Sequence, residues 1–256
     1  MKASLCAFLI AAAALIAPVR VQAEDADAAI ENSVKTSYVF RHFLKHDDVR
    51  VKSFNGVVTL TGTVSDGFHK SLAEETVKAQ LEVKFVDDKL TVKDGGPSKM
   101  SAEWLTAKVK SLMTFHRGVS AHETKIETAD GVVTLRGRAE SQAQKELTEA
   151  YARDVEGVKK VKNEMTIAAA SKARKIEENI DDASITAEVK IALLFHRSTS
   201  ALKTTVKTLR GTVTLGGAAG SDSEKDLATG IVKDVRGVKD VDNQMSVIVI
   251  SSHGSR

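Results

Sequence analysis

The hydrophobic positions of the chain follow the same order of patterns three times. Each copy begins with apolar residues at i, i+4 and i+8, which lie on one face of an α-helix. Two alternating segments joined by a two-residue turn follow, and they predict a β-hairpin. A second helical stripe and a short apolar strand complete the copy, so the predicted order is αββαβ. The first stripes are Ile30, Val34 and Tyr38; Leu105, Val109 and Met113; and Ile185, Val189 and Leu193.

Glycines mark the same places in each copy. Asn55-Gly56, Asp130-Gly131 and Arg210-Gly211 lie in the predicted hairpin turns, where both positions favour residues that tolerate positive φ. Gly137 and Gly217 end the second strands, and Gly157 and Gly237 are expected to stop the second helices in the left-handed conformation. The first copy has Glu82 at that stop, so we expect its helix to end differently. Ser101 and Asp181 are the expected N-caps of the first helix in the second and third copies, respectively.

The repeat predicts an α+β fold of three tandem αββαβ domains, each a three-stranded mixed sheet covered by two helices. Whether these domains pack together or are separate is left open by the sequence. The expected divisions are a signal peptide at 1–23, domain 1 at 24–93, a linker at 94–100, domain 2 at 101–168, a linker at 169–180, domain 3 at 181–250 and a tail at 251–256.

The N-terminal segment predicts export. Lys2 precedes an apolar run at 5–17, and the small residue Ala23 offers a cleavage site before Glu24. The run is shorter than the roughly 20 residues that span a bilayer. We therefore expect a cleaved signal peptide and a periplasmic protein. The cysteine at position 6 lies in this segment, which leaves a mature chain without disulfides or a thiol nucleophile.

The charge balance argues against nucleic-acid binding. Without Lys2 and Arg20, 35 basic residues remain against 34 acidic ones, whereas nucleic-acid binders usually carry a clear basic excess. The middle third of the chain is the most basic. Its cationic residues include Arg136, Arg138, Arg153, Lys159, Lys160 and Lys162.

The second and third copies resemble the BON domain. The residues that carry the resemblance are Gly131, Gly137, Gly157, Asn163 and Met165, and then Gly211, Gly217, Gly237, Asn243 and Met245. The first copy is a diverged version, with Glu82 and Asp88 at two of these places. The resemblance implies the αββαβ fold and an exported protein, similar to osmotically inducible periplasmic proteins. It also implies links to phospholipid binding, envelope integrity, hyperosmotic stress and transport-associated complexes.

The sequence indicates no catalytic or metal site. No GxSxG elbow or phosphate-binding loop is present, and we expect no cofactor. His42 and His46 lie at i, i+4 but without the HExxH frame of a zinc site. Phe-His-Arg recurs at 115–117 and 195–197, and we interpret both as helix C-termini where cations cap free carbonyls. The chain is therefore expected not to be an enzyme.

Phospholipid headgroups or the membrane surface are the predicted partner. Trp104 opens the first helix of domain 2, and tryptophan favours the headgroup region. The basic residues of the same domain would add attraction to an anionic surface. A partly buried tryptophan beside a solvated basic face is the alternative. The other function classes are a periplasmic chaperone-like protein that binds unfolded clients and a scaffold that joins an envelope complex.

Overall fold

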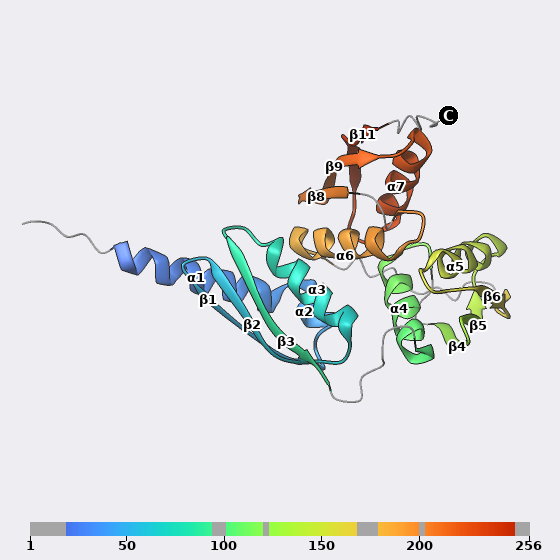
Figure 1. Ribbon diagram of the computed structural model, residues 1–256, viewed down its shortest axis with the longest axis horizontal. Coiled ribbons are helices and arrows are strands. Elements are labelled where there is room, and N and C mark those ends of the chain that lie inside the picture. The colour runs from blue at the N-terminus through green and yellow to red at the C-terminus, as the bar shows by residue number, and fades with distance from the viewer. Residues whose placement is uncertain (1–18, 94–100, 120–122, 168–178, 200–202, 249–256) are drawn as a thin grey trace, which may run out of the picture.

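A computed structural model describes residues 19–93, 101–119, 123–167, 179–199 and 203–248 (Figure 1). The chain forms three tandem α+β domains, which confirms the predicted fold class. The predicted linker 94–100, most of the linker 169–180 and the tail 251–256 lie outside the described residues, as does segment 1–18 of the predicted signal peptide.

The elements follow the repeated order in each domain. Domain 1 contains α1 (Val19–Thr36), α2 (Tyr38–His42), β1 (Asp48–Phe54), β2 (Val57–Val64), α3 (Gly67–Lys78) and β3 (Phe85–Val92). Domain 2 contains α4 (Ala102–Phe115), β4 (Thr124–Ala129), β5 (Val132–Ala139), α5 (Gln142–Asp154), β6 (Lys160–Asn163) and β7 (Thr166–Ile167). Domain 3 contains α6 (Asp182–Phe195), β8 (Lys203–Leu209), β9 (Thr212–Ala219), α7 (Asp222–Asp234), β10 (Asp240–Asn243) and β11 (Ser246–Val247).

Each domain has a mixed sheet with one helical face and one open face. The hairpin strands pair antiparallel, and the last strand returns parallel to the middle one. In domains 2 and 3 that last strand is divided in two, so β6 and β7 both pair with β5, and β10 and β11 both pair with β9. Alternate residues of the middle strand, such as Val133 and Leu135, are fully buried beneath the helices, and their neighbours face outward.

The first predicted helix of domain 1 is two helices. The stripe Ile30, Val34, Tyr38 predicts one helix, but α1 ends at Thr36 and α2 begins at Tyr38. Ser37 lies between them with φ −58° and ψ 152°, and its Oγ donates to the Val34 carbonyl and accepts from Phe40 N. The side chain thus satisfies backbone groups at both helix ends, which makes the break possible. Ser101 and Asp181 are N-caps, as predicted.

The turn predictions hold with one correction. All three hairpin turns have positive φ at both positions, including Arg210 at 53°. Glu82 also has a positive φ, of 68°, as Gly157 and Gly237 do. The helix before it nevertheless ends differently, as expected, because Ala79 after α3 stays in the helical region. The glycines do not stop the helices themselves, because α5 and α7 end before them, where Val155 and Val235 become extended.

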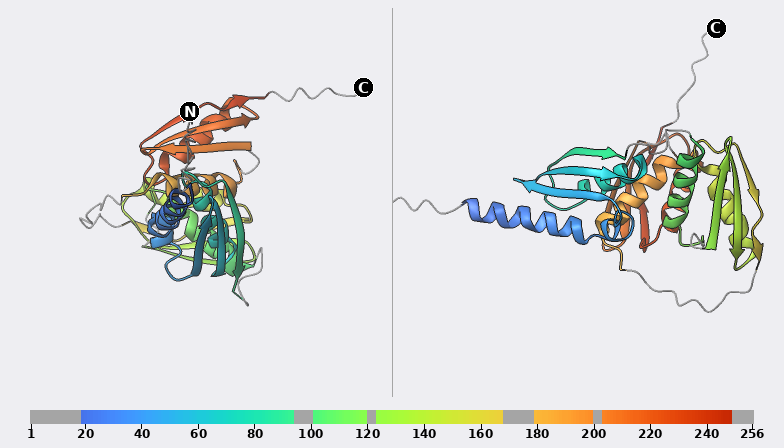
Figure 2. Two further views of the ribbon diagram at one scale, coloured as in Figure 1. Left: turned by 90° about the vertical axis from the view of Figure 1, so that its left-hand side faces the viewer. Right: turned by 90° about the horizontal axis from the view of Figure 1, so that it is seen from below.

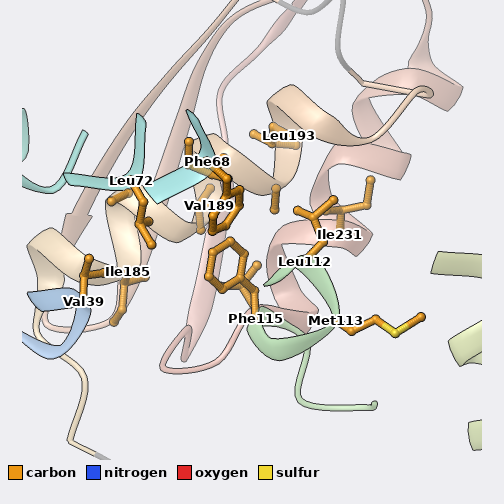
Figure 3. Packing of buried hydrophobic residues seen from close by; sticks show 14 of the residues in the cluster. Val39, Phe68, Leu72, Leu112, Met113, Phe115, Ile185, Val189, Leu193 and Ile231 are labelled. Carbon is orange, nitrogen blue, oxygen red and sulfur yellow. The ribbon is translucent and has the colours of Figure 1, made fainter. Parts of the chain in front are cut away.

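The three domains pack together around α6. Helix α3 of domain 1 and helix α4 of domain 2 both lie against α6 (Figures 1 and 2). Figure 3 shows side chains of all three domains converging there, among them Phe68, Phe115 and Val189. The Phe68 ring lies 5.7 Å from that of Phe115 and 5.9 Å from that of Phe195. One apolar core therefore joins the three copies, which the sequence leaves open.

Candidate functional site

Most of the predicted basic residues lie on the open face of the domain 2 sheet. Leu135 is buried under the helices, so the next residue along β5, Arg136, faces outward, as does Arg138. Lys160 pairs with Val132 and Lys162 pairs with Thr134, which places both lysines on the same outward face. Lys159 is also exposed, beside the hairpin turn, and its side chain lies against Gly131.

Carboxylates neutralise part of this face. Arg136 forms ion pairs with Glu127 and Glu164, and Arg138 lies 3.8 Å from Glu123. Lys160 and Lys162, in contrast, form no ion pair with any residue that the structure describes. The free positive charge of the face is therefore concentrated on β6.

Domain 3 differs from domain 2 at these positions. Asp240 and Asp242 of β10 pair with Thr212 and Thr214 of β9, in the register that Lys160 and Lys162 have against β5. Two lysines in one domain are thus replaced by two aspartates in the other. The basic face is a property of domain 2 and not of the repeated unit.

Trp104 is not part of this face, contrary to the single docking surface that we expected. It lies on α4, in the helical layer, and its ring is partly buried against the core. Lys108 Nζ lies 4.8 Å from the centre of the ring. Arg153 is also in the helical layer, on α5, and pairs with Glu149. Because the helices cover the opposite face of the sheet, one flat surface cannot contact Trp104 and Lys162 together.

A set of polar contacts joins domains 2 and 3, in an arrangement that we call the clamp. It consists of residues 115–117 and 154–158 of domain 2 and residues 195–197 and 234–238 of domain 3. The end of the first helix in each domain pairs with the end of the second helix in the other, through isolated antiparallel bridges His116–Val235 and Val155–His196.

Main-chain hydrogen bonds cross the clamp in both directions. Arg117 N donates to Asp234 O at 2.9 Å, and Arg236 N donates to Phe115 O at 2.8 Å. The same two bonds recur with the roles of the domains exchanged. There Arg197 N donates to Asp154 O at 2.7 Å, and Glu156 N donates to Phe195 O at 3.2 Å. The two domains are therefore related by an approximate twofold arrangement.

The arginines of the clamp cap carbonyl groups of the opposite domain. Arg117 donates to the carbonyls of Val235, at 2.9 Å, and Val238. Arg197 donates to Val158 O at 2.6 Å. From the sequence we interpreted Phe-His-Arg as a helix C-terminus at which the cations cap free carbonyl groups of the same helix. The helices do end there, but the arginines cap carbonyls that follow the second helix of the neighbouring domain.

The histidines meet at the centre of the clamp. His116 and His196 have no exposed surface, and their Nε2 atoms lie 3.2 Å apart. His196 Nδ1 lies 2.9 Å from an Asp154 oxygen, and His116 Nδ1 lies 3.1 Å from an Asp234 oxygen. The Tyr151 ring stacks on His116 at 3.8 Å, and its hydroxyl donates to Asp234 at 2.7 Å.

Burial and partners shift the pKa values of these groups. Burial lowers the pKa of His116, and the nearby Asp234 only partly opposes this. Burial would raise the pKa of Asp154 and of Asp234. At Asp154 the hydrogen bonds from His196 and Ser198 outweigh burial, and at Asp234 the adjacent His116 ring and the hydrogen bond from Tyr151 do so. Both pKa values therefore fall below the ordinary value of 3.8. Both carboxylates are thus ionised at neutral pH.

A buried lysine lies beside the clamp. Lys108 is 1% exposed, and its Nζ lies 4.4 Å from the Phe195 ring centre and 3.3 Å from the Glu156 carbonyl oxygen. Burial lowers its pKa, and Glu156 partly opposes this. Its contact with Phe195 joins domain 2 to domain 3, so the residue serves the interface rather than a site open to solvent.

Sequence reasoning missed the clamp, although a signal was present. Phe-His-Arg and the segment Asp-Val-x-Gly-Val each occur twice, in the second and third copies, and the offset between the two occurrences is the same for both motifs. The first copy has Phe-Arg-His at 40–42 and lacks the aspartate and glycine. In the clamp, each Phe-His-Arg contacts the Asp-Val-x-Gly-Val segment of the other domain, so both motifs must be present in both domains.

Domain 1 exposes an apolar row on the open face of its sheet. Phe54 pairs with Val57, and Val57 pairs with Phe85, so the three residues lie side by side across the strands. Their exposed fractions are 74%, 38% and 63%. The row lies at the hairpin end, away from the other two domains (Figure 1). The corresponding residues in domain 2 are Ala129, Val132 and Lys160.

The described residues contain no group of three or more histidine, cysteine, aspartate or glutamate side chains placed to hold a metal ion. His42 stacks on Tyr38, with ring centres 4.0 Å apart. Among the same residues no helix has both the length and the apolar character of a membrane span.

Comparisons with known proteins agree with the repeat. The profile of the BON domain matches residues 26–94, 101–169 and 181–248. The chain is 35% identical over 143 residues to the osmotically-inducible protein Y of Escherichia coli (strain K12), over 54% of this chain and 71% of that protein. It is 33% identical over 138 residues to an uncharacterized protein of Anaplasma centrale, over 53% of this chain and 90% of that one.

Solved structures resemble the chain more distantly. The C-terminal domain of CdsD, a structural protein of the type III secretion system of Chlamydia trachomatis, is 16% identical with a TM-score of 0.23. The comparison covers 88% of this chain and 98% of that one.

Proposed function

Because this chain belongs to the BON domain family and carries three tandem copies of the domain, we propose that it is a non-catalytic protein of the bacterial envelope. It is exported to the periplasm, acts under osmotic stress and docks reversibly on anionic phospholipid surfaces. The stress role is inferred from its relative in Escherichia coli, whose name records induction by osmotic conditions. Docking takes place through the open face of the domain 2 sheet.

The observation that carries this proposal is the row of lysines without ion pairs on β6, within the part of the chain that the structure describes. Lys160 and Lys162 point out of an uncovered sheet face, next to Arg136 and Arg138. Each basic residue close to an anionic bilayer contributes about 1 kcal/mol. A few such residues give weak binding that salt reverses, because exposed charges are screened within about 8 Å at physiological ionic strength.

Co-sedimentation with liposomes tests the proposal. The chain from Glu24 to Arg256, the form expected after export, is mixed with vesicles of phosphatidylglycerol or of phosphatidylcholine at low and high salt. We expect binding to phosphatidylglycerol at low salt and release at high salt. The variant Lys160→Asp/Lys162→Asp carries the residues of domain 3 and should bind at least tenfold more weakly.

The control variant is Lys207→Asp/Lys233→Asp, which makes the same change of charge at exposed positions of domain 3. It should keep most of the binding. Equal loss in both variants would show that net charge, and not the domain 2 face, governs binding. Absence of binding to either lipid would remove the lipid proposal altogether.

Binding of unfolded polypeptide is the second candidate function, and the apolar row of domain 1 favours it. Phe54 and Phe85 offer exposed aromatic surface on an open sheet face. Natural monomers seldom leave such residues together without a function. A chaperone-like protein would use the row for apolar segments of its clients.

Suppression of aggregation of a reduced model protein, without lipid, tests this second function. Phe54→Ser/Phe85→Ser should lose the suppression, and Leu209→Ser, which changes an exposed apolar residue of domain 3, should retain it. Equal activity of the two variants would exclude the row as a client site.

A further inference from the structure

The centre of the clamp contains two buried histidines, one from each domain, whose rings are hydrogen-bonded to each other. A neutral imidazole carries one proton on one of its two nitrogens. His116 and His196 have four ring nitrogens in close polar contacts. Each Nδ1 faces a carboxylate, and the two Nε2 atoms face each other at 3.2 Å. Each of these carboxylates belongs to the opposite domain.

Two neutral rings supply the protons that these contacts need. Ionised Asp154 can only accept a hydrogen bond, so His196 Nδ1 carries the proton of that ring and His196 Nε2 is an acceptor. His116 Nε2 then carries the proton of the other ring and donates to His196 Nε2. His116 Nδ1 forms no hydrogen bond with the described residues, and the Asp234 oxygen 3.1 Å from it accepts from the Tyr151 hydroxyl.

We infer that the buried pair His116–His196 makes the clamp between domains 2 and 3 responsive to pH. The clamp is closed while both rings are neutral and one N–H lies between the two Nε2 atoms. In acid the open clamp takes up a proton on each ring. The closed clamp cannot hold both, because two N–H groups would then face each other between the Nε2 atoms.

Charged and titratable groups surround the pair from every packed element. Asp154 and Tyr151 approach from α5, and Asp234 approaches from α7. Arg117 and Arg197 follow the histidines and are held by carbonyl groups. Further cations of the interface are the buried Lys108 on α4 and Arg236, which follows α7. The interface is therefore buried and already rich in cations, and a proton on each ring would add two further positive charges to it.

The direction of the response follows from linkage. Burial lowers the pKa of His116 in the closed clamp, so the open clamp binds more protons once the pH falls below about 6.5. Acidification therefore favours opening, and the stabilisation is present above that pH. Protonation of Asp154 and Asp234, whose pKa values lie below 3.8, acts in the same direction only at much lower pH.

The unmodified protein allows a direct count of the protons. Long-range nitrogen–proton NMR spectra of ¹⁵N-labelled chain at pH 7.5 should show a protonated Nδ1 and a bare Nε2 on His196, and the opposite tautomer on His116. Protons on both Nδ1 atoms, with a third between the Nε2 atoms, would overturn the inference without any variant.

Hydrogen exchange measures the opening. The amides of Arg117, Glu156, Arg197 and Arg236 donate across the clamp, and those of Glu164 and Gln244 donate within their own domains to Leu135 and Leu215. After correction for intrinsic exchange rates, protection of the first four should fall at least tenfold from pH 7.5 to pH 5. Protection of the two reference amides should stay within twofold. A parallel fall of all six would mean general unfolding and would contradict the clamp.

His196→Gln provides the variant. The glutamine amide can face His116 with either its NH₂ or its oxygen and does not titrate, so the fall in protection should shrink to threefold or less. His46→Gln, at an exposed position of domain 1, should keep the full fall. An unchanged pH response in His196→Gln would overturn the role of the pair.

Discussion

At the scale of single residues, backbone conformation explains the repeated glycines better than chemistry does. Gly137 has φ 131°, and a Cβ built there would lie 1.9 Å from the Glu123 carbonyl oxygen. Gly62 is in the same position in domain 1, 1.8 Å from Asp48 O. The two hairpins thus bring a neighbouring backbone so close that no side chain fits. Gly230, in contrast, lies in α7 with open space around it.

This contrast predicts opposite effects of one substitution. Gly137→Ala should lower the free energy of unfolding by at least about 2 kcal/mol, because it combines a clash with an unfavourable φ. Gly230→Ala should raise it by about 1 kcal/mol through helix propensity. Urea unfolding followed by circular dichroism measures both. Destabilisation by Gly230→Ala would contradict the prediction, because it would mean that another group packs against this position.

Glu82 gives a second residue-scale prediction. It has a φ of 68°, in the positive region where Gly157 and Gly237, at 97° and 79°, lie without strain. Glu82→Gly should therefore stabilise the protein by about 0.5–1 kcal/mol. The same change at the exposed helical residue Glu103 should destabilise the protein by about 1 kcal/mol. Thermal unfolding compares the two, and equal shifts of the melting temperature would contradict the conformational explanation.

At the scale of elements, Asn163 and Asn243 explain why the last strand is divided in domains 2 and 3. Asn163 Nδ2 donates to the Lys145 carbonyl of α5, and its Oδ1 accepts from Met165 N at 3.2 Å. Asn243 repeats both bonds with Lys225 and Met245. In domain 1, Asp88 accepts from Leu90 N and pairs with Lys70, and β3 continues without a break. The asparagine fixes the strand to the helix.

Asn163→Ala should therefore cost about 1–3 kcal/mol, because it leaves partly buried backbone groups without partners. Hydrogen exchange should show the loss of protection at Met165 and at β7 before other parts of domain 2. Gln142→Ala, at an exposed position of α5, serves as the control. It should leave the free energy of unfolding nearly unchanged, as surface substitutions usually do. Equal effects of the two variants would exclude the proposed role of Asn163.

At the scale of the whole molecule, contacts between copies join what the repeat would leave as three small domains. Domain 1 adds its own contacts to α6. Val39 N donates to Ser184 Oγ at 3.1 Å, and Lys190 pairs with Glu75 at 2.8 Å. The clamp joins domains 2 and 3. A domain of about 70 residues has a marginal core, so shared burial is a large part of the stability.

Breaking the clamp should separate the unfolding of its two domains. Arg197→Ala leaves the Val158 carbonyl without its charged donor and should cost about 1.5–3 kcal/mol. Calorimetry should then show two transitions where the unmodified protein shows one. Arg153→Ala, which removes an exposed ion pair on α5, should keep a single transition. Two transitions in the unmodified protein would show that the clamp does not couple the domains.

The sequence by itself determined the repeat, the order of the elements, the hairpin turns and the caps at Ser101 and Asp181. These features depend on neighbours a few residues apart, so a local pattern is enough to specify them. It could also assign Lys160 and Lys162 to the basic residues of the middle domain, but it did not show that they lie on a strand or on a different face from Trp104. The face that a side chain occupies becomes known only when the helices cover one side of the sheet.

Only the tertiary structure decided how the copies meet. His116 and His196 lie far apart in the sequence, and their pairing depends on two domains approaching in one orientation. The apolar stripes that predict each helix are the same whether a helix faces its own sheet or a neighbouring copy, because burial is not directional. Directional contacts such as those of Arg117 and Arg197 select one arrangement from the many that would bury the same surface. That selection is a property of the folded chain, and it turns three repeats into one molecule.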